Sequence, residues 1–589
     1  MRDRWNSWLR IRAFGPLLLG LLLACGEPQP PAPSPELSDR VDFSGGRNDP
    51  PGEPQYGGIL RWAERAEPTT LDPAYAGNDL QSARVAMQIF ESLLTYDVDL
   101  NLRPALAQAW QVQDGGRRYR FKLRPRAVFH DDRCFPGQKG RRVVAQDVKY
   151  SLERILDPSL HCNQASLLEQ ALYGNRRSAA AELRNSGVGI HALGSEQLEV
   201  VLAQPHSSFL HLLTMVFTSV VPREAVQYYG EDFGRHPVGS GPFVFHRWLS
   251  EQQIELQRHS GYGVLDLNRR RLPYLDGALI RFLGSPDVEL LEFQAGTLDL
   301  LHSISASAFP SIVENGSRVR AAFRNYRVLA TENFGTELLG VNMQHPLLGS
   351  NRKLRQALAL AVDREALTEV LLSGRAIPAT GLLPRMSVGP DKPRTESGVH
   401  DPPRARQLLE EAGFPGGKGL PVFRLLFNAS PTVERLVTYL QAALVEIGIQ
   451  IRMLPVPFSE FLERLQSGDF DLYRDHLAAD HAAADAFFGY FYGPYSAPQS
   501  INITRFQDSA YDSLFDRLQR QSQEVQRSRL QTQLQSRLDR AAPAVFLFHP
   551  LRFRLQIEQL KNSPMSPLGH LDLKNAWLDP EWIGPRKPQ

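Results

Sequence analysis

After its first 55 residues the chain alternates segments with the period of a β-strand and segments with the period of an α-helix, and this alternation limits the possible folds more than any other feature. Tyr119, Phe121 and Leu123 alternate with basic residues, a pattern that predicts a strand with one buried and one exposed face. In residues 354–362 apolar side chains recur at i, i+3, i+4, i+7 and i+8, which predicts a helix with one buried stripe. We therefore expect a mixed α/β body.

Other segments carry the same two signals. Strands are expected at residues 57–62, 243–245, 254–256, 423–427 and 450–453, and helices at 401–413, 459–468 and 509–538. The helix after Asp401 has the clearest ends, because aspartate is a preferred N-cap, proline is favoured in the first turn, and Gly413 stands where a glycine commonly ends a helix.

The composition narrows the class of protein. Of the 589 residues 42% are apolar and 22% are charged, proportions that exclude a disordered or fibrous chain. The 66 basic and 64 acidic side chains give a formal charge of +2, so the chain has no basic field and we expect no nucleic-acid partner. The length corresponds to about three or four average domains, or to one large architecture.

Residues 1–24 are expected to be an export signal. Four arginines precede the twelve-residue apolar run 13–24. The run is too short to span a bilayer, because a spanning helix needs about 20 apolar residues. It leads into the letters LLACG at residues 22–26, which resemble the lipobox of bacterial lipoproteins. That resemblance implies that Cys25 is lipidated and becomes the first mature residue. The alternative is an ordinary signal peptide with a free or buried cysteine.

Residues 25–55 are expected to be a lipidated cysteine followed by a proline-rich tether. The stretch 26–54 holds eight prolines and four glycines among 29 residues, a composition typical of an extended linker. Loss of residues 1–24, with four arginines and one aspartate, moves the formal charge from +2 to −1. The sequence therefore predicts a nearly neutral exported protein, in the periplasm or on the cell surface, anchored to a membrane through Cys25.

Six blocks stand out in order along the body. They are PTTLDP at 68–73, VFHD at 128–131, VGSGPF at 238–243, the helical block 352–364, the block 401–413 and GDFDL at 468–472. In this order they resemble the family 5 extracellular solute-binding proteins, the oligopeptide- and dipeptide-binding components of bacterial ABC importers. The resemblance extends over residues 56 to about 550.

This resemblance implies a fold. The family has two lobes joined by two hinge crossovers, with the ligand enclosed between them, in the type II, cluster C form of the periplasmic-binding-protein fold. By analogy we expect lobe I at residues 56–330 plus 546–589, with an extra subdomain at 78–215, and lobe II at 331–545.

It also implies a function. We expect a monomeric receptor without a cofactor that captures short peptides between closing lobes and delivers them to the permease subunits of an ABC importer. Lobe closure would exclude water and so strengthen charge contacts with the ligand. The alternatives are the same fold with another solute, such as a metal chelate or a sugar, and a secreted, lipid-anchored hydrolase.

One carboxylate is the expected partner of the peptide ammonium group. In the family this aspartate follows the Gly-Asp-Phe-Asp strand, and Asp480 occupies the corresponding place. The segment departs from the family at Leu477, where tryptophan is usual. The alternative for Asp480 is a helix cap or a loop carboxylate.

Six aromatic residues follow within residues 487–495. Binding clefts are mostly apolar and aromatic with few polar anchors, so these side chains are candidates for the wall of a ligand pocket. We single out Tyr490 and Tyr492 as ligand contacts. The alternative is packing in the core or between the lobes.

Metal binding and catalysis are two alternatives to peptide binding that we considered. Imidazole and carboxylate groups gather at Asp475, His476, Asp480, His481 and Asp485. That ligand set suits zinc or nickel, but two histidines five positions apart do not share a helix face, and we predict no metal site. Ser350 and Lys353 have the Ser-x-x-Lys spacing of some acyl-transfer enzymes, but a helix start explains them better, and we predict no enzyme.

Cys134 and Cys162 remain once Cys25 is assigned to lipid. Export to an oxidising compartment permits disulfides, and only 27 residues separate the two cysteines. We therefore expect a disulfide between them, worth about 3 to 4 kcal/mol in the chain-entropy account. Two free thiols are the alternative.

Overall fold

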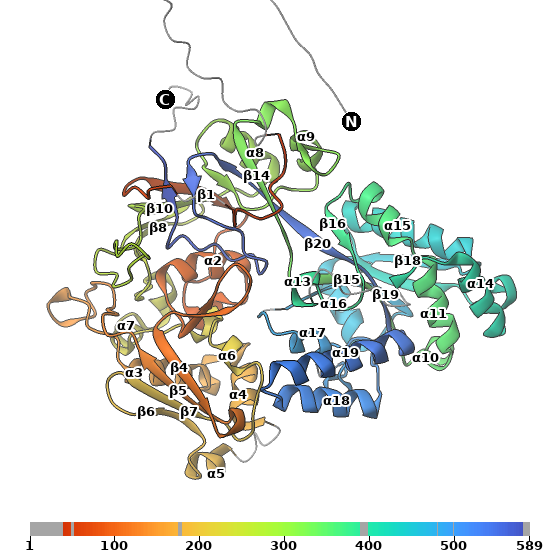
Figure 1. Cartoon of the computed structure of the whole chain (residues 1–589), viewed down its shortest axis with the longest axis horizontal. Coiled ribbons are helices and arrows are strands. Elements are labelled where there is room, and N and C mark those ends of the chain that lie inside the picture. The colour runs from red at the N-terminus through yellow and green to blue at the C-terminus, as the bar shows by residue number, and fades with distance from the viewer. Residues whose placement is uncertain are drawn as a thin grey trace, which may run out of the picture. The chain divides into compact units, whose positions relative to one another are not determined.

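The computed structural model describes residues 39–48, 52–174, 180–388, 398–479, 481–498 and 500–580. The expected signal peptide and the expected lipid attachment at Cys25 lie outside these residues. Within the described ranges no helix has the length and apolar character needed to cross a membrane. The largest element is a twelve-stranded sheet whose two halves, which we call lobe I and lobe II, share one long strand (Figure 1).

Lobe I is built on β1 (Ile59–Glu64) and its neighbours in the sheet. β1 runs parallel to β10 (Gly277–Phe282), and β9 (Gln253–Arg258) and β8 (Phe243–Leu249) continue the sheet in antiparallel pairing. Trp62 in β1 is fully buried in the core of lobe I. The three strands predicted in this part of the chain are confirmed.

Lobe II is built on four strands. They are β15 (Gly335–Val341), β19 (Leu472–Ala478), β17 (Phe423–Asn428) and β18 (Ile451–Val456), in that order across the sheet. Every residue of β15 is buried, as expected for a strand covered on both faces. The strands predicted at 423–427 and 450–453 are confirmed.

Helices of lobe II bury apolar stripes against these strands. They include α11 (Arg352–Ala361), α14 (Pro402–Glu411), α15 (Pro431–Glu446) and α16 (Phe458–Ser467). α11 begins after Asn351, whose side chain accepts a hydrogen bond from Leu354 N at 3.1 Å. The helices predicted at 354–362, 401–413 and 459–468 are confirmed.

The helix predicted at 509–538 is two helices. α18 (Ser509–Arg520) ends where Gln521 turns to an extended conformation, and α19 (Glu524–Ala541) begins three residues later. The two helices pack on each other and bury Leu518 and Leu534. The sequence pattern missed this break because neither glycine nor proline marks it.

β20 (Ala544–Ile557) joins the two lobes (Figure 1). Its residues 544–548 pair with β15, and its residues 551–557 pair antiparallel with β14 (Tyr326–Glu332). On its other side the second half pairs with β11 (Leu300–Leu301), the neighbour of β1. One strand is thus hydrogen-bonded into both lobes.

The chain crosses between the lobes a second time where β14 passes into β15. Asn333 N at this crossing donates to Pro550 O of β20 at 2.8 Å. The two crossings therefore lie side by side. We call residues 333–334 and 549–550 the hinge.

Lobe I also carries a separate antiparallel sheet of four strands. Its order is β4 (Ala107–Gln113), β5 (Arg118–Leu123), β7 (Gln197–Val201) and β6 (Gly189–Ala192). Tyr119, Phe121 and Leu123 are buried while Arg120 and Lys122 between them are exposed, which confirms the strand predicted from their alternation.

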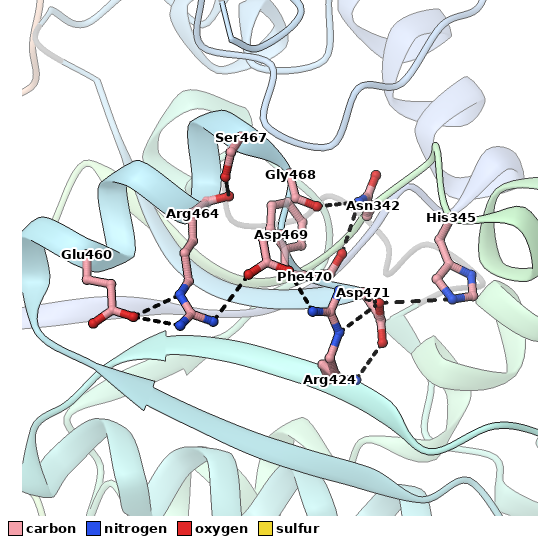
Figure 2. Close-up of polar contacts among 10 residues, drawn as sticks. All are labelled: Asn342, His345, Arg424, Glu460, Arg464, Ser467, Gly468, Asp469, Phe470 and Asp471. Atoms are coloured by element: carbon pink, nitrogen blue, oxygen red, sulfur yellow. Dashed lines mark hydrogen bonds and ion pairs between the residues drawn. The ribbon is translucent and has the colours of Figure 1, made fainter.

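The GDFDL block forms a turn that ties lobe II together (Figure 2). Gly468 ends α16 with φ of 83°, a left-handed conformation that favours glycine. The Asn342 side-chain amide donates to two carbonyl oxygens of the turn, at 3.2 and 2.9 Å. Arg424 of β17 pairs with Asp469 at 2.6 Å and with Asp471 at 3.1 Å. The block therefore serves the packing of the lobe.

Residues 39–48 belong to the segment expected to be a tether, yet they pack on lobe I. Val41 N donates to Ser317 O and Asp42 N donates to Val328 O, both at 2.8 Å. Val41 itself is only 6% exposed. The composition predicted a linker because it does not record that the edge of β14 has backbone groups free to pair.

The disulfide predicted between Cys134 and Cys162 is wrong for this structure, because both cysteines are free thiols. The Cys162 thiol donates to Ala74 O at 3.1 Å, and burial raises its pKa. Burial and the neighbouring Asp132 raise the pKa of Cys134 to about 12. The two thiols have different partners in lobe I, which the spacing of the cysteines in the sequence could not reveal.

The PTTLDP block holds a buried ion pair that we predict to be important for stability. Asp72 is 4% exposed and pairs with both terminal nitrogens of Arg154, at 2.9 and 2.5 Å. Asp72→Asn leaves the guanidinium without its counter-charge, so it should lower the free energy of unfolding by about 3 kcal/mol. Urea denaturation measures this loss. Asp157→Asn, an exposed cap in the same lobe, is the control, and an equal effect of both variants would contradict the prediction.

Candidate functional site

The candidate site lies at the hinge, where both chain crossings meet lobe I. A pocket of about 330 Å³ opens there, and we call it the hinge pocket. Its lining comes from β1, the start of α2 (Leu80–Ile89), α8 (Pro286–Gln294), the segment after β11, Asn333 of one crossing and the part of β20 that directly follows the other. The lining residues are Ala63, Glu64, Arg65, Leu80, Gln81, Arg84, Glu289, His302, Ser303, Asn333, Leu551 and Arg552. No local pattern in the sequence indicated this pocket, because these residues come from separate segments.

A second cavity, of about 380 Å³, lies between residues 87–105 and 562–575. All of its lining residues precede β11 or follow β20, so movement of one lobe against the other would not open or close it. The hinge pocket is lined by Asn333 of one crossing and by Leu551 and Arg552, which directly follow the other. It is therefore the better candidate for a ligand whose binding is coupled to lobe movement.

One wall of the hinge pocket is a buried ion pair. Glu64 is 2% exposed, and its carboxylate pairs with the Arg84 guanidinium and accepts a hydrogen bond from Trp62 Nε1 at 3.1 Å. Burial raises the pKa of Glu64, and the charge of Arg84 opposes that shift. The pair fixes one positive and one negative charge at the C-terminal end of β1.

Glu289 and His302 also line the pocket. Glu289 is 6% exposed, and burial raises its pKa to about 7, although Arg65 Nε lies 3.8 Å from the carboxylate. His302 contacts Gly569 O through Nε2 at 3.1 Å. Burial and three nearby arginines lower the pKa of His302 well below its usual value, so its ring is neutral at pH 7.

Arg552 approaches the pocket from β20. Its Nη2 donates to Asn333 Oδ1, on the other crossing, at 3.2 Å. Burial, and then the charge of Arg84, lower the pKa of Arg552 to about 10, so it is still positively charged at pH 7. Among the described residues no carboxylate lies within 4.0 Å of its guanidinium. Arg552 thus brings to the hinge a charge that no described side chain neutralises.

Asp480, the predicted partner of a peptide ammonium, lies outside the described residues. Its neighbours on both sides are described. β19 ends at Ala478, opposite Gly335, and Ala479 N contacts Phe334 O in the hinge at 3.5 Å. On the other side, Ala482 N donates to the Tyr96 hydroxyl of lobe I at 3.1 Å. Ala479 thus contacts the hinge, and Ala482 contacts lobe I.

The structure places the two predicted tyrosine contacts differently. The Tyr490 hydroxyl donates to Ala478 O at 2.9 Å, which puts its ring beside the end of β19. Tyr492 is 7% exposed, and its hydroxyl donates to Asp516 of α18 at 2.6 Å. The neighbouring phenylalanines, Phe487, Phe488 and Phe491, are buried in the core of lobe II. Most of the aromatic cluster is therefore packing, the alternative considered from the sequence.

Side chains from the same segment contact the four-stranded subdomain of lobe I. The Asp485 carboxylate accepts a hydrogen bond from Ser207 Oγ and pairs with Arg527 of α19 at 2.9 Å. The Tyr495 hydroxyl contacts Gln170 of α4 (Ala165–Tyr173). These contacts join the lobes at a distance in sequence from the hinge.

In the segment weighed for metal binding and rejected, two of the side chains have other partners. His476 Nδ1 lies 3.2 Å from Glu337, and Asp485 pairs with Arg527. Over the described ranges no group of three or more histidine, cysteine, aspartate or glutamate side chains is placed to hold a metal ion.

Ser350 and Lys353 do not face each other. Ser350 Oγ donates to Pro346 O at 2.6 Å within α10 (Pro346–Ser350), while Lys353 Nζ pairs with Glu411 of α14 at 3.3 Å. Their spacing therefore has a structural explanation, at the junction of two helices.

Three histidines, His481 buried and His206 and His211 half-buried, lie where lobe I meets the segment after β19. His211 and His481 stack with ring centres 6.0 Å apart, and His211 Nδ1 bonds to the Tyr96 hydroxyl at 2.8 Å. Burial lowers the pKa of His211 to about 3 and those of His206 and His481 to about 4. All three are therefore neutral at pH 7.

Comparison with known sequences places the body in one group of proteins. The sequence model described as bacterial extracellular solute-binding proteins, family 5 Middle, matches residues 101–499. A protein of Pseudomonas aeruginosa, "Probable di/tripeptide-binding protein 5", is 28% identical over 487 residues, which cover 80% of this chain and 86% of the relative. The glutathione-binding protein GsiB of Salmonella typhi is 28% identical over 386 residues, covering 65% of this chain and 67% of the relative.

Solved structures share the fold. The unliganded periplasmic murein tripeptide-binding protein MppA superposes with a TM-score of 0.73 at 20% identity, covering 92% of this chain and 99% of MppA. The oligopeptide-binding protein AppA from Bacillus subtilis, in complex with a nonapeptide, superposes with a TM-score of 0.67 at 22% identity, covering 90% of this chain and all of AppA. The two-lobed fold expected from the sequence is confirmed.

We predict that His206, His211 and His481 make the protein less stable in mild acid. Their pKa values of about 3 to 4 lie below the value of about 6.5 in an unfolded chain, so the unfolded state binds more protons as the pH falls. The stability they contribute is complete above pH 6.5 and is lost as the pH falls towards 4. Thermal unfolding between pH 7 and 4.5 measures the slope. His481→Gln should make it shallower, and His246→Gln, at an exposed position of β8, should not. Equal slopes in both variants would contradict the assignment.

Proposed function

Because the chain belongs to family 5 of the bacterial extracellular solute-binding proteins, we propose that it captures short peptides between its lobes and delivers them to the permease of an ABC importer. The observation that carries this proposal is a pocket beside the hinge of a two-lobed body, lined by Asn333 of one crossing and by the residues that directly follow the other. The relative named as a di/tripeptide-binding protein, which matches 80% of the chain, supports peptides as the solute class. No catalytic step is part of the proposal.

The proposed mechanism is closure about the hinge. Lobe I would comprise residues 56–330 and 546–589, with the extra subdomain at 78–215, and lobe II residues 331–545. Movement about two adjacent crossings would change few backbone dihedrals, since β20 is paired with β15 and β16 (Ala376–Pro378) in lobe II and with β14 in lobe I. A ligand that contacts both lobes favours the closed form in proportion to its differential affinity, and the permease would recognise that form.

Asp480 is proposed as the partner of the peptide ammonium. Support comes from its sequence position directly after β19 and from the contacts of its neighbours with the hinge and with Tyr96. Tyr490, held against Ala478, is proposed as the aromatic wall beside it. Tyr492, whose hydroxyl is bonded to Asp516, would contribute through the packing of that wall.

The proposed location is outside the cytoplasm. The signal-like residues 1–24 would direct export, Cys25 would carry the lipid, and the segment up to residue 38 would hold the body near the membrane. The receptor would act as a monomer without a cofactor. Its partners would be the ligand, the permease subunits and, through the lipid, the membrane.

A ligand screen tests the proposal. Binding to the native state raises the melting temperature, because the ligand does not bind the unfolded chain. The full mature protein is screened against pools of di- and tripeptides, glutathione, metal chelates and sugars. We expect stabilisation by peptides or by glutathione, itself a tripeptide. A shift with sugars or chelates and none with any peptide would overturn the peptide assignment.

Replacing the proposed ammonium partner gives a sharper prediction. Asp480→Asn should weaken binding of peptides with a free N-terminus by about 2 to 5 kcal/mol, because the ammonium would be desolvated without a counter-charge. The N-acetylated forms of the same peptides should bind both proteins alike. Isothermal calorimetry measures both, with Asp232→Asn, an exposed position in lobe I, as the control. If wild type and Asp480→Asn bind free peptides equally, Asp480 is not in the site.

The lipid anchor is tested separately. Cys25→Ser removes the sulfur that would carry the lipid, so the exported protein should move from the membrane fraction to the soluble fraction. Its mass should also lose the acyl groups found on the wild-type N-terminus. A Cys25→Ser protein that stays in the membrane fraction would argue for another mode of attachment.

A further inference from the structure

The hinge pocket holds more positive charge than its carboxylates neutralise. Arg65, Arg84 and Arg552 line it, and Arg554 follows two residues later in β20. The acidic residues of the lining are Glu64 and Glu289. Glu64 is committed to Arg84. Glu289, whose buried carboxyl has a pKa of about 7, is only partly ionised at neutral pH.

Arg552 and Arg554 carry the positive charges that no described carboxylate neutralises. Arg554 is fully buried and donates to the backbone and side chain of Ser563, at 2.8 and 3.2 Å. Burial, then the nearby Arg552 and Arg84, lower the pKa of Arg554 to about 9, so it too remains charged at pH 7. Within the part of the chain that the structure describes, neither arginine has a carboxylate partner.

Unused hydrogen-bond donors accompany this charge. A guanidinium has five N–H donors, and Arg552 uses one of them, towards Asn333. Arg84 Nε, nine-tenths buried, has no hydrogen-bond partner among the described residues. A buried charge or donor without a partner lowers stability, so such a group favours any ligand that supplies the missing acceptor.

We propose that the hinge pocket receives a carboxylate of the bound ligand, held by Arg552 together with Arg84. The inference rests on the proposed peptide-binding function, and it identifies the ligand class as peptides that present a carboxylate at the hinge. A carboxylate matches the planar fork of a guanidinium and accepts two parallel hydrogen bonds from it. Its charge would offset the excess carried by Arg552 and Arg554.

The position of Arg552 couples ligand binding to the hinge. Arg552 follows one crossing by two residues in β20 and donates to Asn333 of the other. A carboxylate bound there stands where the two crossings meet, so its contacts depend on the hinge conformation. The anion therefore contributes to closure as well as to affinity.

The carboxylate has two possible sources, the C-terminus of the peptide or an acidic side chain, and the test separates them. Calorimetry with the full mature protein compares Ala-Ala-Ala with its C-terminal amide, and the amide of Ala-Glu-Ala with the amide of Ala-Gln-Ala. Glutarate, which has carboxylates but no peptide bond, is the fifth probe. We expect one acid to bind at least about ten-fold more tightly than its matched neutral form, as for a charge-assisted bidentate contact.

Substitutions test whether this difference in affinity arises in the hinge pocket. Arg552→Gln should raise the Kd of the favoured acid to that of its neutral form, and Arg552→Lys should restore part of the difference. Arg281→Gln is the matched control, because Arg281 pairs with Glu292 in lobe I and does not line the pocket. Melting temperatures without ligand establish that each variant folds.

Each outcome decides the question. Equal affinity of wild type for both acids and their neutral forms overturns the inference, and this comparison needs no variant. An equal loss for acids and neutral forms in Arg552→Gln also overturns it. If no peptide binds, the proposed function fails, and glutarate alone then tests the pocket. Stabilisation by glutarate that Arg552→Gln abolishes supports the inference, and no stabilisation overturns it.

Discussion

The rest of the structure depends on the pairing of β20 with both halves of the sheet. Residues 544–548 of this strand are in register with β15, and residues 551–557 are in register with β14. Between these two ladders, residues 548–550 pair with β16 (Ala376–Pro378), so few backbone dihedrals of the strand can change without breaking pairs. The position of the hinge, and of the pocket beside it, follows from this constraint.

The same strand explains why charge accumulates at the hinge. Arg552 and Arg554 are two residues apart in β20, so their side chains leave the same face. Arg554 is fully buried, and Arg552 is half-buried beside the pocket. Positive charges that lack a carboxylate partner in such a place lower the stability of the fold. In a solute-binding protein, a solute that supplies the missing negative charge would restore this stability. The hydrogen bond from Arg552 to Asn333 connects that charge to the hinge.

Much of the fold could be predicted, because it depends on patterns within single segments. The alternation at Tyr119, Phe121 and Leu123 and the stripe of α11 report burial directly. The predictions that failed depend on partners remote in sequence. Val41 packs against β14 despite its proline-rich surroundings, and Cys134 and Cys162 find different neighbours. The aromatic run at 487–495 was recognised, but only the fold could assign most of it to the core of lobe II.

The amino-acid sequence by itself determined the mixed α/β body, the strand and helix positions, the family and the candidate Asp480, since period, caps and motif order are local properties of the chain. Tertiary structure alone decided which polar groups meet. Glu64, Arg84, Glu289, Asn333 and Arg552 line one pocket although they are spread over most of the chain. No local pattern can report such a meeting, because it arises from strand pairing between distant segments, and the charge balance of the hinge is set by that pairing.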